Sequence, residues 1–255
     1  MIAELIGAIL IGLSLGIFGS GGSILTVPVL VYLAGQDPKL AIAGSLLVVG
    51  TISLITSLLN LRQGNISWRH VTWLGLPGIA GTFAGAVSAT LVSGSVQLLC
   101  FSGLMLLAVS FMWRSKPVSA EPQSPPHNAL LIIQGSVIGV LTGFVGVGGG
   151  FLLVPALVLL GRLDFSRAAA TSLVIIFINS TVGFIQYHHV LAQQSLQLDW
   201  TVLALLATFG VGGSLAGQKL AKRLPKAKLQ KGFAIFLMII ALFILYQTLP
   251  PLLEA

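Results

Sequence analysis

Hydrophobic residues occur in ten runs along this chain, and short polar connections separate the runs. They cover about 2–18, 23–34, 40–61, 71–92, 95–113, 128–146, 150–161, 167–187, 198–218 and 231–249. Most approach or exceed the ~20 residues that a helix needs to cross a bilayer. The second and seventh runs hold about 12 residues, or ~18 Å of helix, and cannot cross alone. The pattern predicts an all-α polytopic membrane protein with two short helices that turn inside the membrane.

Composition supports this class. The chain has 255 residues, of which 56% are hydrophobic and 7% are charged, against about 25% charged residues in soluble domains. The net charge of +7 comes from basic residues in the short connections, which is typical of membrane orientation and not of nucleic-acid binding. We therefore expect the lipid bilayer as a partner and no nucleic acid. The first run lacks a basic leader and a cleavage site, so we do not interpret it as a signal peptide.

Several kinds of chemistry have no residues to carry them. The single cysteine, Cys100, excludes internal disulfides and cysteine-cluster metal sites, and we expect no metal or cofactor. No Ser/His/Asp grouping, His-x-x-x-His pattern or aspartate pair falls within the membrane, so an enzyme is not expected. No acidic residue lies in the middle of a hydrophobic run, whereas carriers driven by protons or sodium usually hold a carboxylate there.

A glycine-rich stretch occurs twice. Gly16–Pro28 reads GIFGSGGSILTVP, and Gly143–Pro155 reads GFVGVGGGFLLVP, at a constant offset of 127. The same offset places Asp37 on Asp164. The chain is therefore expected to contain two copies of one membrane unit.

The repeat continues after a five-residue insertion in the second copy. An offset of 132 then places Trp68 on Trp200, and GTFAG at 81–85 on GSLAG at 213–217. Duplication therefore covers nearly the whole chain. We divide the chain into a first membrane repeat (residues 1–114), a linker (115–127) and a second membrane repeat (128–255). Together they are expected to form one transport domain.

Basic residues predict how the two repeats are oriented. If the first two runs of each half return the chain to its starting side, 12 of the 13 Lys and Arg residues lie on one side and only Lys39 on the other. If each short run instead turns back on the far side, the split is 9 to 4. The positive-inside rule favours the first arrangement. It predicts an inverted repeat with both termini outside, the linker in the cytoplasm and a glycine-rich broken-helix hairpin in each half.

The glycine-rich bends can bind an anion. The first turn of a helix has N–H groups without partners, and the helix dipole adds positive charge there. Two such starts entering from opposite faces would form an anion site without a basic side chain in lipid. Since packing alone does not need so many glycines in a row, we favour a binding role for these bends. The residues are Gly19, Ser20, Gly21, Gly22, Ser23, Gly146, Val147, Gly148, Gly149 and Gly150.

Close helix packing is the alternative explanation for glycine. Small residues four apart occur as Gly12/Gly16, Gly81/Gly85, Gly139/Gly143 and Gly213/Gly217. Such pairs let transmembrane helices approach closely. For the pairs at 81/85 and 213/217 we favour packing.

Other polar residues can complete the site. Ser45 and the equivalent Ser172, with Thr171, begin long helices after the short ones, and Asn179 lies about two turns further along. A hydroxyl can equally bond to its own helix, so that alternative stays open. Residues 186–189, which read QYHH, are expected to form an interfacial cap whose tips stay wet.

The duplicated Gly-x-x-Gly-x-Gly-Gly-(Gly/Ser)-x-x-x-Val-Pro bends, together with the length and the two similar halves, resemble the sulfite exporter TauE/SafE family. The resemblance covers essentially the full chain. It implies transport of sulfite, sulfoacetate and related organosulfonates across the bacterial cytoplasmic membrane. The motif falls on Gly19, Gly21, Gly22 and Pro28, and on Gly146, Gly148, Gly149, Gly150 and Pro155. Ser23 replaces the glycine found at 150, so the two half-sites are chemically unequal.

Residues and resemblance together predict an exporter of small sulfur-containing anions, driven by the membrane potential. An anion channel and an importer of a different small anion remain alternatives. A membrane enzyme and a non-transporting assembly factor are weaker ones. A homodimer is compatible with the sequence, which does not determine the oligomeric state.

Overall fold

The structure, a computed structural model, describes residues 2–61, 64–114, 127–146, 150–193 and 197–253. Every regular element in this part of the chain is a helix. The helices of the first half are α1 (Ile2–Phe18), α2 (Gly21–Pro28), the π-helical η1 (Val29–Leu33), α3 (Pro38–Leu61), α4 (Trp68–His70), the π-helical η2 (Val71–Gly75), α5 (Leu76–Ala89) and α6 (Gly94–Arg114). Those of the second half are α7 (Asn128–Val145), α8 (Gly150–Leu159), α9 (Phe165–Gln193), α10 (Trp200–Ala221) and α11 (Lys226–Leu253).

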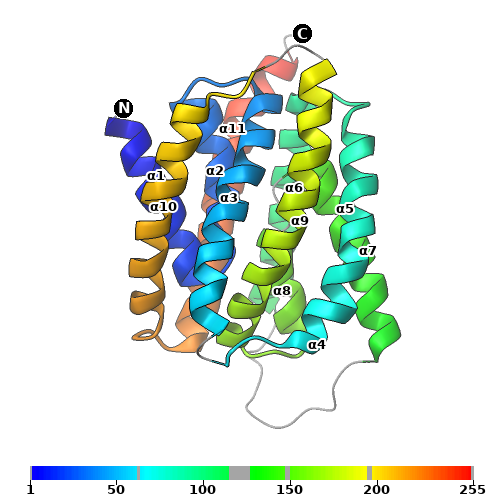
Figure 1. Ribbon diagram of the computed structural model, residues 1–255, viewed down its shortest axis with the longest axis vertical. Helices are drawn as coiled ribbons and strands as arrows, with labels where there is room; N and C mark the ends of the chain where they lie inside the picture. Colours follow the sequence, from blue (N-terminus) through cyan, green and yellow to red (C-terminus); the bar gives the residue numbers. More distant parts are fainter. Residues whose placement is uncertain (1, 62–63, 115–126, 147–149, 194–196, 254–255) are drawn as a thin grey trace.

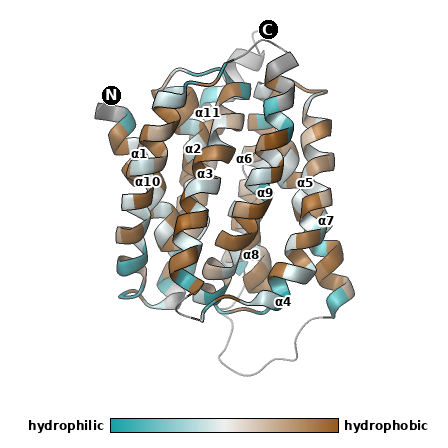
Figure 2. Ribbon diagram, viewed as in Figure 1, coloured by the Kyte–Doolittle hydropathy of each residue, from teal (hydrophilic) through white to brown (hydrophobic). Residues whose placement is uncertain are grey.

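The hydrophobic runs of the sequence correspond to these helices. Because η1 continues α2, and α4, η2 and α5 are continuous, the described residues form ten helical stretches. Seven of them are long and apolar enough to cross a membrane. Hydrophobic residues cover the middle of the bundle and hydrophilic residues gather at its two ends (Figure 2). The prediction of an all-α polytopic membrane protein is confirmed.

The two short helices form hairpins with the helices before them. In Figure 1, α1 descends from the end where the chain starts and α2 turns back toward the same end, whereas α7 and α8 do the same from the opposite end. Pro28 ends α2, and the chain continues as π-helix. A proline has no N–H for the usual helical bond, which accounts for the change of pitch. Pro155 does not end α8, which runs on to Leu159.

Helices α3 and α9 form the centre of the bundle. Their spans are 67% and 56% buried, more than any other span in the described chain. Around them, α1 packs along α10 and α5 packs along α7, so each half supplies one helix to each of these pairs. The two halves are therefore interlocked and share one core.

Glycine permits these two close pairings. A Cβ on Gly81 would collide with the backbone oxygen of Ser136, and one on Gly213 would lie 2.5 Å from the backbone oxygen of Ile9. The packing role predicted for the pairs at 81/85 and 213/217 is confirmed. Neighbouring helices approach backbone to backbone because lipid supplies no hydrophobic force between them, and van der Waals contact must hold them together.

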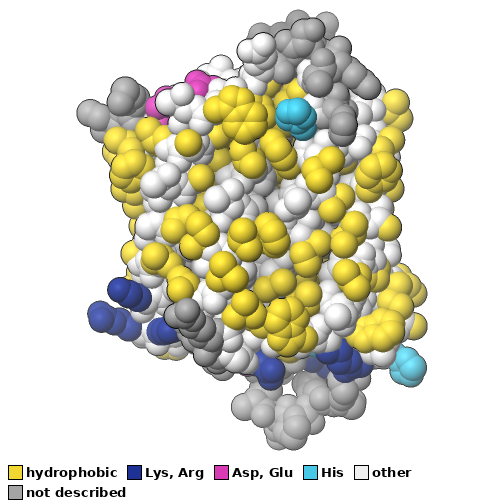
Figure 3. Space-filling view, in the orientation of Figure 1, with side chains coloured by type: hydrophobic (Ala, Val, Ile, Leu, Met, Phe, Trp, Pro, Cys, Tyr) yellow, Lys and Arg dark blue, Asp and Glu magenta, His cyan; other side chains and the backbone are white. Residues whose placement is uncertain are grey.

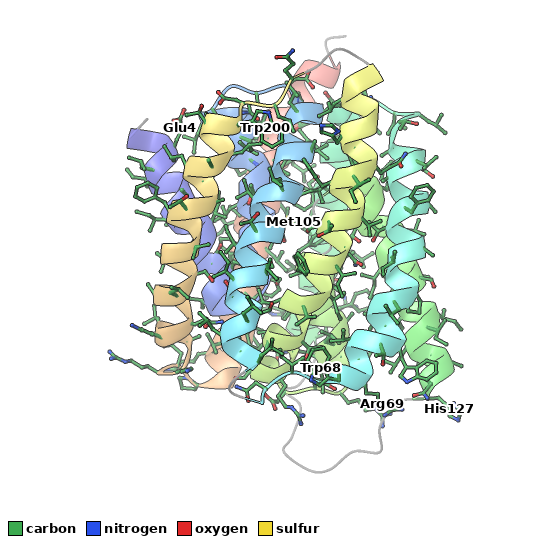
Figure 4. The ribbon with its side chains drawn as sticks, viewed as in Figure 1. Glu4, Trp68, Arg69, Met105, His127 and Trp200 are labelled. Atoms are coloured by element: carbon green, nitrogen blue, oxygen red, sulfur yellow. The ribbon has the colours of Figure 1, made fainter. Side chains whose placement is uncertain are left out.

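Equivalent helices run in opposite directions. Helix α3 descends while α9 ascends, and the chain begins and ends at the same end of the bundle (Figure 1). Trp68 and Trp200, which the offset of 132 makes equivalent, lie at opposite ends (Figure 4). These directions are the ones an inverted repeat requires, and the inversion itself stays a prediction.

Candidate functional site

The first bend connects α1 to α2 at Gly19. Gly19 has a φ of +75°, a conformation that costs little only for glycine. Its carbonyl accepts a hydrogen bond of 3.0 Å from the Oγ of Ser172 on α9, which also donates to the Ala169 carbonyl at 2.8 Å. Ser172 therefore holds the first bend from the other half of the chain.

The second bend is held in the same way. Gly146 has a φ of +72°, and its carbonyl accepts a hydrogen bond of 3.2 Å from the Oγ of Ser45 on α3. Ser45 and Ser172 are equivalent by the repeat, and each is fully or almost fully buried. Each half thus contributes the serine that fixes the bend of the other half, and both bends are anchored to the central helices.

The two short helices meet near their first residues. A Cβ on Gly150, the first residue of α8, would lie 2.5 Å from the Oγ of Ser23 and 3.1 Å from the backbone oxygen of Ser20. Ser23 itself donates to the Ser20 carbonyl at 2.7 Å. The two N-terminal ends therefore converge, but Ser23 fills the space between them and leaves no room for a methyl group.

The start of α2 keeps unpartnered polar groups. No side chain caps this helix, and the Oγ of Ser20 is fully buried without a hydrogen-bond partner among the described residues. The first N–H groups of a helix carry partial positive charge and favour anions. Ser20 therefore adds a hydroxyl donor to a helix start suited to a negative ligand.

Packing explains those glycines of the bends that the structure describes. This result contradicts the expectation that packing alone does not need so many glycines in a row. A Cβ on Gly21 would lie 2.9 Å from the Ser14 carbonyl oxygen, and one on Gly22 would lie 2.6 Å from the Cβ of Leu15. Both glycines let α2 fold tightly against α1. Their number is therefore no argument for a ligand, and the N–H groups and Ser20 alone support that role.

Two further predicted residues lie away from the bends. The Oγ1 of Thr171 accepts a hydrogen bond of 3.0 Å from the backbone N–H of Ser67, so it fixes the connection before α4. Asn179 faces Gly78 on α5, and its Oδ1 is buried without a partner in the described chain. Val147, Gly148 and Gly149 lie outside the described residues.

A cavity of about 90 Å³ reaches the first bend from one end of the bundle. We call it the inner cavity. Gly16 and Gly19 border it on one side, and polar or charged side chains line it. These side chains are Asn60, Asn65, Ser166, Gln218 and Lys222. Among its described lining residues it is therefore rich in hydrogen-bond donors, with one cation and no carboxylate.

None of these polar lining residues is among the site residues predicted from the sequence. Asn60 and Gln218 lie at or next to the ends of the hydrophobic runs 40–61 and 198–218, and Lys222 lies in the basic connection that follows the second of these runs. One signal was available: the offset of 127 places Tyr187 at the position equivalent to Asn60, so the repeat is strongly asymmetric there. Spatial convergence on Gly19 could not be read from the sequence.

The opposite end of the bundle differs. Tyr187 is only 4% exposed, and its hydroxyl lies 2.8 Å from the Nε2 of Gln97 and 3.2 Å from the Phe144 carbonyl oxygen. The expectation that Tyr187 forms a wet interfacial cap is wrong. Gln97 on α6 supplies a polar partner inside the bundle, which makes burial of the hydroxyl favourable.

Metal chemistry has no visible support in the described chain. Within it, no group of three or more His, Cys, Asp or Glu side chains could hold a metal ion. Asp164 and Asp199 accept hydrogen bonds from backbone N–H groups at helix starts, where a carboxylate stabilises the first turn. These two acidic residues serve as helix caps.

Comparison with known proteins agrees with this architecture. Residues 5–244 match the family described as Sulfite exporter TauE/SafE. The chain is 30% identical over 248 residues to a "Probable membrane transporter protein" of Xylella fastidiosa (strain 9a5c), covering 94% of this chain and 92% of that protein. It is 28% identical to the "Probable membrane transporter protein YunE" of Bacillus subtilis (strain 168), covering 94% and 96%. No solved structure matches. The chain therefore belongs to the sulfite exporter TauE/SafE family, and it is a membrane transporter and not an enzyme.

Proposed function

We propose that this transporter exports small sulfur-containing anions, such as sulfite, sulfoacetate or related organosulfonates. The inner cavity is the observation that carries the proposal. Amide and hydroxyl side chains and Lys222 line the same cavity as Gly19, with no carboxylate among the described lining residues. Such a lining attracts an anion and has no negative charge to repel it. The cavity ends at the first bend, which is followed by the uncapped start of α2.

The charge distribution supports a location in a bacterial inner membrane, with the anion entering the inner cavity from the cytoplasm. Lys and Arg side chains gather at the end of the bundle that holds Arg69, and acidic side chains appear at the other end (Figures 3 and 4). The inner cavity opens at the basic end, beside Lys222. By the positive-inside rule this end is cytoplasmic, both termini are outside, and the repeat is inverted.

The membrane potential can drive the transport. With the inside negative, moving one negative charge outward releases about 2.3 kcal/mol per 100 mV. No acidic residue lies in the middle of a hydrophobic run, which supports transport without a coupling ion. An anion at the first bend would continue toward the second between Ser23 and Gly150, so the two helix starts must separate during the cycle.

Flux through the purified protein in proteoliposomes tests this function. We would measure efflux of radiolabelled sulfite, sulfoacetate, thiosulfate, sulfate and taurine while a potassium gradient with valinomycin sets the potential. Flux of one or more sulfur anions should follow the potential and ignore imposed proton and sodium gradients. Strict dependence on either gradient would contradict the uniport mechanism, and absence of flux for all five would contradict the substrate class.

The same preparation separates the alternatives. An anion channel would give single-channel currents in a planar bilayer, whereas a transporter with alternating access would not. An importer of a different small anion would leave the five sulfur anions untransported and would accumulate its own anion against a concentration gradient only when a coupling-ion gradient is imposed.

A further inference from the structure

Tyr187 closes one end of the bundle from within. Its hydroxyl lies 3.4 Å from the Gly143 carbonyl oxygen and 3.2 Å from that of Phe144, at the end of α7. Gln97 on α6 donates from its Nε2 both to the Phe144 carbonyl, at 2.7 Å, and to the Tyr187 hydroxyl, at 2.8 Å. Three helices from both halves therefore meet at one small polar cluster.

The repeat shows what stands in the same place at the basic end. Tyr187 corresponds to Asn60 by the offset of 127, and Gln97 corresponds to Leu229 by the offset of 132. Asn60 and Leu229 both line the inner cavity. The Nδ2 of Asn60 donates to the Thr56 carbonyl of its own helix, at 3.1 Å. The shorter side chain thus turns back instead of spanning the gap.

The backbone groups at the two ends complete the comparison. The carbonyls that Tyr187 and Gln97 contact belong to Gly143 and Phe144, whose equivalents at the basic end are Gly16 and Ile17. Both equivalents line the inner cavity. The same site in the architecture is therefore open at one end and filled by a tyrosine and a glutamine at the other.

We propose that Tyr187 and Gln97 form the outer gate of the transport pathway, and that the structure shows the inward-open state. Opening the far end requires the Tyr187 hydroxyl to leave the α7 carbonyls, while the inner cavity closes around Asn60 and Leu229. The gate rests on the proposed function in one respect, because it takes the inner cavity as part of the transport pathway.

Two features suit the cluster to a gate. The Oε1 of Gln97 is buried without a hydrogen-bond partner in the described chain, so the closed arrangement is incompletely satisfied and can be broken. The Tyr187 hydroxyl also lies next to Gly146, 3.1 Å from where a Cβ would stand. Movement of the gate would therefore act directly on the second bend and on Ser45, which holds that bend.

Thiol accessibility tests the gate without any substrate. In a Cys100→Ser background, Ala170→Cys reports on the inner cavity, and Ala43→Cys reports on the equivalent position at the outer end. A membrane-impermeant maleimide should label Ala170→Cys from the basic side and leave the buried Ala43→Cys unlabelled from the other. Adding Tyr187→Phe and Gln97→Leu removes every hydrogen bond of the cluster and should raise outer labelling of Ala43→Cys at least about tenfold, the ratio expected from the loss of one such bond alone.

A reciprocal variant keeps the proposal testable if the first folds poorly. Asn60→Tyr with Leu229→Gln transplants the cluster to the inner end and should reduce labelling of Ala170→Cys about tenfold. Unchanged labelling at both reporters in the two variants would overturn the gate. Because labelling needs no transported anion, failure of sulfur-anion flux would leave the gate standing, and failure of the gate would leave the flux result standing.

Discussion

The Oγ of Ser172 donates a hydrogen bond of 3.0 Å to the backbone carbonyl of Gly19, across 153 positions of sequence. The equivalent Ser45 donates to the Gly146 carbonyl at 3.2 Å. Each bend therefore depends on a helix of the other repeat. In a membrane, an unpaired carbonyl is costly, so these two bonds help irregular backbone to persist inside the bundle.

Replacing Ser172 with alanine should loosen the first bend. The Gly19 carbonyl would lose the serine's hydrogen bond, which lowers the free energy of unfolding by about 1 kcal/mol. We expect a lower melting temperature and reduced anion flux. Ser57→Ala is the matched control, because within the described chain the Ser57 hydroxyl donates only to the Leu54 carbonyl of its own helix. Equal effects of the two changes on flux would show that the bond to Gly19 has no functional weight.

Two neighbouring glycines on α10 should respond oppositely to alanine. A Cβ at Gly213 would lie 2.5 Å from the Ile9 carbonyl oxygen on α1, whereas one at Gly212 has nothing within 4 Å. Gly213→Ala should destabilise the protein by about 1–3 kcal/mol, because α1 must move away. Gly212→Ala should be neutral or slightly stabilising, since alanine favours helix. Thermal unfolding in detergent measures both. A tolerated Gly213→Ala would contradict the close α1–α10 contact.

Arg162 occupies a backbone position that suits glycine. Its φ is 56°, and its repeat equivalent, Gly35, has a φ of +64°. A non-glycine residue in this conformation costs roughly 1 kcal/mol. Arg162→Gly should therefore melt at a higher temperature than Arg162→Ala, although both lose the same charge. The reverse order would show that the turn does not hold a positive φ.

Lys222 should contribute to anion capture through its charge. Lys222, the residue after α10, lines the inner cavity, whereas Lys219 near the end of α10 does not, although both residues are exposed. Lys222→Ala should raise the KM for the transported anion roughly fivefold at low salt, with a smaller effect at high salt. Lys219→Ala removes the same charge outside the cavity and should change the KM little. Identical effects of both variants would indicate that only the net charge of this end matters.

The sequence by itself determined the membrane class, the duplication, the glycine-rich bends and most helix boundaries to within three residues, the exceptions being the end of α9 and both ends of α11. Each of these rests on local information: hydropathy along the chain marks helices, and constant offsets mark repeats. Gly19 and Gly146 lie in the predicted bends, and both have a positive φ. The sequence reveals such positions because a positive φ favours glycine.

Only the tertiary structure decided which groups meet. Ser45 and Ser172 are polar residues that the sequence predicts for the site, but their hydrogen bonds to the bend of the other half depend on how α3 and α9 pack. The burial of Tyr187 depends on Gln97, which lies 90 positions away. Hydropathy measures the transfer of one residue into lipid. These contacts arise instead from shape complementarity and hydrogen bonding between helices, which hydropathy does not report. The repeat allowed two chemically different ends, and folding placed the cavity at one and the tyrosine at the other.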